Sequence, residues 1–123
     1  MPTVLIAEDD EAGRHLLARR LMQRGYDVIL AADGADAVTL AVNERPDIII
    51  MDLSMPIMDG VEAWRTIREM SSSPPPVIAL TGALIEDVRI TCVELGFAAY
   101  IVKPYDYYDV LKCVDGILNA KAA

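Results

Sequence analysis

The sequence predicts a single α/β domain built on a doubly wound parallel sheet. Short apolar runs alternate with helical patterns along the chain, and such runs suit strands that are buried on both faces of a parallel sheet. The chain has 123 residues, of which 54% are hydrophobic, and this is enough for one core. We therefore expect residues 1–123 to form one domain, with right-handed crossovers that place helices on both faces of the sheet.

Five apolar runs are the expected strands. Each run is four to six residues long and is bounded by charged or turn-forming residues. The runs cover residues 3–7, 26–31, 47–52, 77–80 and 98–102.

Five amphipathic segments are the expected helices, because their apolar residues recur every three or four positions. The first extends from residue 11 to 24 and stops at Gly25, and the second ends before Pro46. A capping box of Asp59 and Glu62 begins the third, and Asp106 can cap the fifth. The apolar stripes are Leu16, Leu17 and Leu21; Val38, Ala41 and Val42; Val61, Trp64, Ile67 and Met70; Ile85, Val88, Cys92 and Leu95; and Val110, Leu111, Val114, Ile117 and Leu118. The tail from residue 120 shows no pattern.

The natural strand order at this size is 2-1-3-4-5, the flavodoxin-like arrangement. Its switch point lies between the first and third strands. Glu8 and Asp9 follow the first strand, and Asp52 ends the third. The sequence therefore predicts that three carboxylates meet at this crevice.

The composition excludes several classes of function. A formal net charge of -8 argues against binding of nucleic acid or an anionic membrane by this domain, because both need a basic field. No apolar run approaches the ~20 residues of a membrane-spanning helix, and no signal-peptide pattern opens the chain, so we expect a soluble, cytoplasmic protein. Cys92 and Cys113 lack metal-ligand spacing and are expected in or beside the core.

The ends of four expected strands carry the groups that phosphoryl transfer needs: Glu8 and Asp9, Asp52, Thr81, and Lys103. Crowded carboxylates repel one another unless a cation lies between them, and an all-oxygen site with room for water suits Mg²⁺. The Lys103 ammonium can neutralise one phosphoryl oxygen, and the Thr81 hydroxyl can donate to another. Asp52 can act as the nucleophile.

Four motifs resemble one known family. They are I-A-E-D-D after the first strand, M-D-L-S-M-P-I-M-D-G around Asp52, A-L-T-G-A around Thr81, and Y-I-V-K-P around Lys103. Together they make residues 4–118 similar to the receiver domain of response regulators in two-component signalling, of the single-domain chemotaxis-receiver-like type. No single motif is specific, but the set is.

The resemblance implies a phosphoacceptor and a metal site. Asp52 matches the phosphoacceptor, and Asp9 matches a direct ligand of Mg²⁺. Glu8 matches a metal-binding acid that would act mostly through water, and it replaces the commoner Asp. The backbone carbonyl of Ser54 would complete the protein ligands.

The resemblance also implies a switch. Thr81 matches the switch hydroxyl, Lys103 the phosphoryl-binding lysine, and Tyr100 the aromatic switch residue. Gly82 stands where a small residue with a side chain is more usual, which loosens that loop. The bond before Pro104 is similar to one that is cis in the family.

The implied function is a phosphorelay signalling receiver. A histidine kinase or histidine phosphotransfer protein would supply the phosphoryl group from phosphohistidine, and Asp52 would accept it with Mg²⁺. The surface of the fourth helix, fifth strand and fifth helix would then change shape and bind a downstream protein. We expect no output domain after the fifth helix, so that the signal leaves by binding.

Aromatic and charged residues gather at this expected output surface. Exposed tyrosines are enriched at interfaces, although two of them can equally pack on the core. The core alternative applies to Tyr105 and to one of Tyr107 and Tyr108. The full set consists of Tyr100, Tyr105, Tyr107 and Tyr108, flanked by Glu86, Arg89 and Asp109.

Three alternatives remain open. A Mg²⁺-dependent aspartyl-phosphate phosphatase of the haloacid-dehalogenase-like class would need a second Asp where Ser54 stands. A flavin-binding module would need a phosphate loop where Glu8 and Asp9 would repel phosphate. A receiver-like scaffold would never be phosphorylated. The receiver itself would phosphorylate and dephosphorylate its own Asp52 without turning over a separate substrate.

Overall fold

The computed structural model describes residues 1–82 and 93–122. Five parallel strands form one sheet in the order β2-β1-β3-β4-β5. This confirms the predicted fold class and strand order. The strands are β1 (Thr3–Ala7), β2 (Asp27–Ala31), β3 (Ile48–Asp52), β4 (Val77–Thr81) and β5 (Ala99–Val102).

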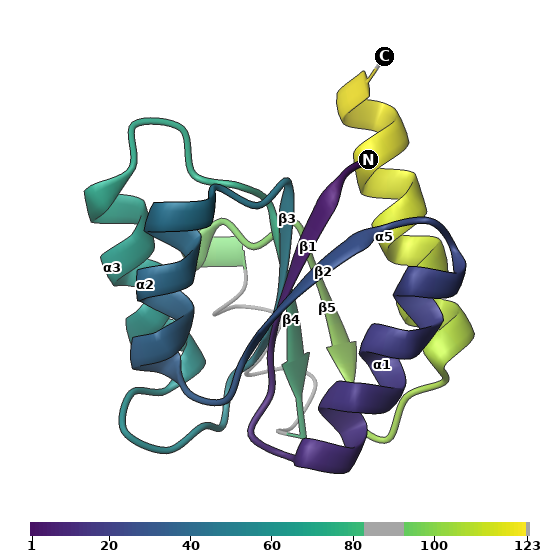
Figure 1. The fold of residues 1–123 in the computed structure, drawn as a ribbon. Helices are drawn as coiled ribbons and strands as arrows, with labels where there is room; N and C mark the ends of the chain where they lie inside the picture. Colours follow the sequence, from purple (N-terminus) through teal and green to yellow (C-terminus); the bar gives the residue numbers. More distant parts are fainter. Residues whose placement is uncertain (83–92, 123) are drawn as a thin grey trace.

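Helices cover both faces of this sheet. In Figure 1, α1 and α5 lie on one side, and α2 and α3 lie on the other. The bounds are α1 (Glu11–Gln23), α2 (Gly34–Glu44), α3 (Gly60–Met70) and α5 (Tyr107–Ala122). Of the expected fourth helix, residues 93–95 are helical, whereas Ile85, Val88 and Cys92 lie outside the described residues. None of the described helices is long and apolar enough to cross a membrane.

The core forms two layers because successive strand residues point to opposite faces. Val4 and Ile6 of β1 pack with Ile48 and Ile50 toward α1 and α5. The alternate strand residues Leu5, Ile49 and Met51 point to the other face and pack toward α2 and α3, where the α3 residues Ala63, Trp64 and Ile67 are also buried. Each aliphatic side chain buried in this way contributes roughly 1.5 to 3 kcal/mol. The central strands are therefore rigid supports for whatever follows them.

Aspartates fix the starts of the helices next to the carboxyl edge of the sheet. The side chain of Asp10 accepts from the Gly13 amide at 2.9 Å and begins α1. Asp59 accepts from the Glu62 amide at 2.9 Å and begins α3, as the capping box predicts. Each such cap typically contributes about 1 kcal/mol.

Three details differ from the sequence predictions. Leu16 is 45% exposed, because Leu17, Ala18 and Leu21 are the α1 residues that face the sheet. Met70 is 59% exposed, because α3 ends there beyond the edge of the core. The tail residues Ala120 to Ala122, in which the sequence shows no pattern, continue α5.

The tyrosines near β5 divide between the core and the surface. Tyr105 and Tyr107 are partly buried against the core, with ring centroids 5.7 Å apart, whereas Tyr108 is 57% exposed. The interpretation that two of these rings pack on the core is therefore confirmed. The side chains of Glu86 and Arg89 lie outside the described residues.

Candidate functional site

The predicted site residues come together at the carboxyl edge of the sheet. Glu8 follows β1 directly, Asp52 and Thr81 end β3 and β4, and Lys103 follows β5. Backbone hydrogen bonds continue the sheet pattern here: the Glu8 amide donates to the Ala31 carbonyl at 3.1 Å, and the Lys103 amide to the Thr81 carbonyl at 2.7 Å. The hydrogen-bond ladder of the sheet therefore extends to Glu8 and Lys103.

Three carboxylates converge at this edge. Glu8 and Asp52 are 4% and 2% exposed, whereas Asp9 is exposed. Each carboxylate offers an oxygen that lies within 4.8 Å of the others. We call Glu8, Asp9, Asp52 and Lys103 together the acid site.

Lys103 is the cation of the acid site. Its Nζ donates to Asp52 Oδ2 at 2.6 Å and lies 3.4 Å from Glu8 Oε2. A buried carboxylate without a partner is costly, so the ammonium stabilises Asp52 as an anion. The peptide bond from Lys103 to Pro104 is cis, as the resemblance implies.

The second oxygen of Asp52 is also held. The Ser54 amide donates to Asp52 Oδ1 at 2.9 Å, so the two carboxylate oxygens have different partners. The side chain cannot rotate without breaking one of these contacts. Asp52 is therefore a buried carboxylate with a fixed orientation.

The pKa values of Glu8 and Lys103 are both raised in the acid site, with different consequences near neutral pH. Burial, followed by the hydrogen bond and the negative charge of Asp52, raises the pKa of Glu8 to about 7. Partial burial alone would lower the pKa of Lys103, but the hydrogen bond and charge of Asp52, together with Glu8, raise it instead. Lys103 is therefore charged near neutral pH, and Glu8 exchanges its proton there.

The charges of the acid site fit a hard divalent cation. Three carboxylates face one ammonium among the described residues, so the cluster carries a net charge of -2 when all three are ionised. Carboxylate oxygens are the ligands that Mg²⁺ prefers, and the exposed Asp9 leaves room for bound water. The donor set is thus compatible with Mg²⁺.

Thr81 and Tyr100 lie on the same face of the sheet. Ala79 pairs with Tyr100 and Thr81 with Val102 in the β4–β5 register, and alternate residues of a strand share a face. Thr81 is buried, and the partly buried ring of Tyr100 packs against Ala79. The two residues predicted to form the switch therefore share one face of the sheet.

Two neighbours of the acid site were missed by the sequence reasoning. Arg14 Nη1 donates to the Glu8 carbonyl at 2.7 Å and so ties the first turn of α1 to the end of β1. Burial, followed by the negative charge of Glu8, raises the pKa of Tyr105 to about 12, so its phenol stays neutral. The sequence signal for Arg14 was its place on the first turn of the helix that follows the acidic run.

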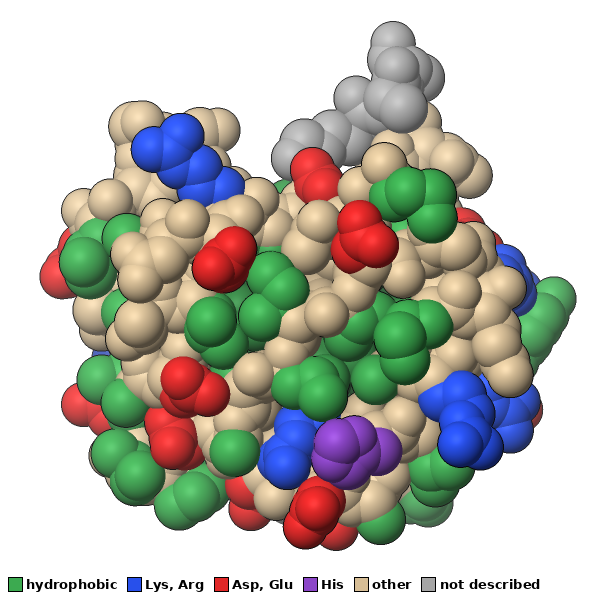
Figure 2. Space-filling model, in the orientation of Figure 1, with side chains coloured by type: hydrophobic (Ala, Val, Ile, Leu, Met, Phe, Trp, Pro, Cys, Tyr) green, Lys and Arg blue, Asp and Glu red, His purple; other side chains and the backbone are tan. Residues whose placement is uncertain are grey.

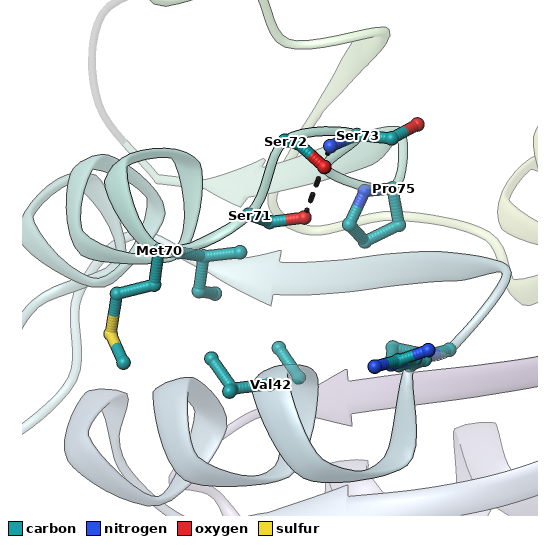
Figure 3. A pocket seen from close by; sticks show the side chains of 10 residues that line it. Val42, Met70, Ser71, Ser72, Ser73 and Pro75 are labelled. Carbon is teal, nitrogen blue, oxygen red and sulfur yellow. Dashed lines mark hydrogen bonds between the residues drawn. The ribbon is translucent and has the colours of Figure 1, made fainter.

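A separate pocket of about 370 Å³ lies at the opposite edge of the sheet (Figure 3). Figure 3 shows Val42 on one helix, Met70 on another and Ser71, Ser72, Ser73 and Pro75 in the loop above them. The remaining lining residues are Ala41, Arg45, Pro46 and Ile67. We call these ten residues the distal pocket.

Comparison with known proteins identifies the family. The sequence model of the response regulator receiver domain matches residues 4–115. The chain therefore belongs to the response regulator receiver domain family, which confirms the resemblance read from its motifs.

Individual relatives agree with this assignment. The transcriptional regulatory protein PrrA of Mycobacterium bovis is 32% identical over 122 residues, which are 99% of this chain and 52% of PrrA. This chain thus spans about half the length of such curated relatives.

Solved structures extend the comparison. The receiver domain of the Francisella response regulator 1452 superposes with a TM-score of 0.91 at 27% identity and full coverage of both chains. The receiver domain of the Pseudomonas aeruginosa sensor histidine kinase PA1611 superposes with a TM-score of 0.80 at 33% identity, covering 90% of this chain and 92% of that one. That receiver domain was crystallised with a magnesium ion coordinated in its active-site cleft.

Proposed function

We propose that this chain, as a single receiver domain over residues 1–123, accepts a phosphoryl group from phosphohistidine onto Asp52. One observation carries the proposal: Asp52 is buried at a strand end, with one oxygen held by the Ser54 amide and the other by the Lys103 ammonium. A buried carboxylate fixed in this way is oriented for nucleophilic attack. The donor would be a histidine kinase or a histidine phosphotransfer protein.

The transfer is a displacement at phosphorus. A carboxylate oxygen of Asp52 forms the new O–P bond while the P–N bond to the imidazole breaks, and the electron pair of that bond stays on the imidazole nitrogen. Negative charge spreads over the three remaining phosphoryl oxygens in the transition state. Lys103 Nζ, already 2.6 Å from Asp52, neutralises part of this charge without having to move into place.

The metal would be held by Glu8, Asp9, Asp52 and the backbone carbonyl of Ser54, with Glu8 acting mostly through water. Three of these ligands have carboxylate oxygens within 4.8 Å of one another, which supports the assignment. Bound Mg²⁺ supplies charge neutralisation at the phosphoryl oxygens. Arg14, through the Glu8 carbonyl, would keep the backbone of this ligand set in position.

Phosphorylation would shift the protein between two conformations. Thr81 would turn toward the new oxygens, and Tyr100 would follow on the same face of the sheet. Inverting the populations from 1:99 to 99:1 needs ~5.5 kcal/mol, whereas one hydrogen bond to a charged group contributes ~1.5 to 3 kcal/mol. Thr81, Lys103 and the metal must therefore together supply this free energy. The altered surface of helix 4, β5 and α5 would bind the downstream protein.

The test uses phosphoramidate, a small phosphodonor, with and without Mg²⁺. Intact mass should show the gain of one phosphoryl group in the wild-type chain with Mg²⁺, and none in Asp52→Asn. If the wild-type chain gains no phosphoryl group with Mg²⁺, the proposal is wrong and the chain is a scaffold that is not phosphorylated. An equal gain in Asp52→Asn would exclude Asp52 as the acceptor.

A further inference from the structure

The loop that connects β3 to α3 holds an exposed isoleucine in a conformation that isoleucine rarely adopts. Ile57 has φ of 70° and is 83% exposed. The Met58 amide donates to the Pro56 carbonyl at 2.7 Å, which closes a three-residue turn around Ile57. Positive φ is a genuine outlier for a β-branched residue, and glycine or asparagine would adopt it more readily.

Close contacts at both ends fix this loop in place. A Cβ added to Gly34 would come within 2.0 Å of the Met58 carbonyl oxygen, so the loop lies directly on the start of α2. A Cβ added to Gly60 would come within 2.4 Å of the Asp52 carbonyl oxygen, and the Gly60 amide donates to Leu53 at 3.1 Å. Ile57 therefore cannot withdraw its side chain by a shift of the whole loop.

The position of this side chain relative to Asp52 follows from chain geometry. Three residues span at most about 11 Å, so Ile57 Cα lies within about 11 Å of Gly60 Cα and within roughly 15 Å of the Asp52 carbonyl. A specific protein interface covers about 800 Å² on each partner, which is a disc of about 16 Å radius. A protein that brings phosphohistidine to Asp52 and centres its contact there covers Ile57.

We infer that Ile57 is a specificity-determining contact for the protein that donates the phosphoryl group. The inference rests on the proposed function. An apolar side chain held rigidly in solvent adds nothing to the core, and its conformation opposes folding, whereas burial under a partner would stabilise the complex. The partner that would cover Ile57 is the phosphohistidine-bearing protein, because its contact with Asp52 brings it over this loop.

Two substitutions separate the side chain from the backbone conformation. Ile57→Gly keeps the turn and removes the side chain, and Ile57→Asn keeps the turn with a polar side chain. Met70→Ser is the matched control, because Met70 is another exposed apolar residue, at the far end of α3. The melting temperatures of both Ile57 variants should equal or exceed that of the wild type, which checks that they fold.

Two phosphodonors then distinguish an effect of Ile57 on binding of the donor protein from an effect on the phosphoryl transfer step itself. One is phosphoramidate, and the other is a purified, autophosphorylated histidine kinase, chosen from a screen for transfer to the wild-type chain. Both Ile57 variants should react with phosphoramidate at the wild-type rate, and kcat/KM from the kinase should fall about tenfold, with Met70→Ser unchanged.

Equal transfer from the kinase to the wild type and to both Ile57 variants would overturn the inference. So would equal slowing with phosphoramidate, because the loop would then act on the chemistry itself. If phosphoramidate labels the wild type but no kinase in the screen does, the assigned partner class is wrong and the inference is lost with it. Failure of phosphoramidate on the wild-type chain would instead overturn the proposed function.

Discussion

The acid site and the distal pocket lie at opposite edges of the same sheet, and only the acid site gathers buried charge. At the carboxyl edge, Glu8 and Asp52 are buried beside the Lys103 ammonium. At the amino edge, the distal pocket has apolar walls, three serines and the exposed Arg45 (Figure 3). A volume of about 370 Å³ does not make the distal pocket reactive, because none of its groups is a buried charge or a nucleophile with an adjacent base.

The difference follows from how each edge is built. The residues of the acid site lie at the ends of β1, β3 and β5, of which β3 is buried along its whole length. Helix ends and a serine-proline loop form the distal pocket, and such surface segments tolerate change. On the face drawn in Figure 2, apolar side chains are interspersed with charged ones.

The largest expected effect comes from removing the cation of the acid site. Lys103→Gln should lower the rate of phosphorylation by phosphoramidate about 100-fold or more, because preorganised charge stabilisation at a reacting centre contributes this much. The rate is measured by intact mass against time at fixed Mg²⁺. A rate within threefold of wild type would mean that Lys103 only stabilises the unphosphorylated protein.

The second prediction concerns the tight loop at the acid site. Gly60→Ala should lower the free energy of unfolding by about 1 to 3 kcal/mol or more, because its Cβ would meet the backbone of Asp52 and Leu53 at 2.4 and 2.8 Å. Gly116→Ala is the matched control. Its Cβ would meet nothing within 4 Å, so it should stabilise α5 by about 0.5 to 1 kcal/mol. Urea unfolding measures both, and a neutral Gly60→Ala would contradict the packing.

The third prediction concerns pH. Because the pKa of Glu8 is raised in the folded protein from 4.5 to about 7, its contribution to stability is full below pH 4.5 and is lost as the pH rises through 7. In the absence of divalent cations, wild type should therefore lose stability relative to Glu8→Gln between pH 5 and pH 8. The loss should be about 2 to 3 kcal/mol, because most of the effect of a shift from 4.5 to about 7 falls in this pH range. Parallel urea titrations that gave the same pH dependence for both proteins would contradict the raised pKa.

The smallest expected effect comes from the distal pocket. Arg45→Gln should leave phosphorylation by phosphoramidate unchanged and change the free energy of unfolding by less than about 0.5 kcal/mol, because Arg45 is exposed and remote from the acid site. The same mass and urea measurements apply. A loss of phosphorylation in this variant would show that the two edges of the sheet are coupled.

Much of the fold could be predicted because its signals are local. Short buried strands, helix caps such as Asp59, and acids placed at strand ends are visible in the sequence. The convergence of Glu8, Asp9, Asp52 and Lys103 followed from topology alone, since parallel strands end at one edge.

Other features depend on three-dimensional packing and could not be predicted. The exposure of Leu16 depends on which part of an apolar stripe α1 turns toward the sheet. The contact of Arg14 with the Glu8 carbonyl depends on a side-chain conformation. The positive φ of Ile57 occurs in a loop that lies against Gly34, which is distant in sequence. Such features arise from neighbours that are distant in sequence, so no local pattern records them.

The central claim is tested most directly by locating the phosphoryl group on the chain. After reaction with phosphoramidate and Mg²⁺, borohydride reduces an aspartyl phosphate to homoserine, and peptide mass spectrometry then identifies the modified position. We expect homoserine at position 52 in the wild-type chain and none in Asp52→Asn. Modification at Glu8, at Asp9 or at a residue away from the acid site, with position 52 unchanged, would contradict Asp52 as the phosphoacceptor.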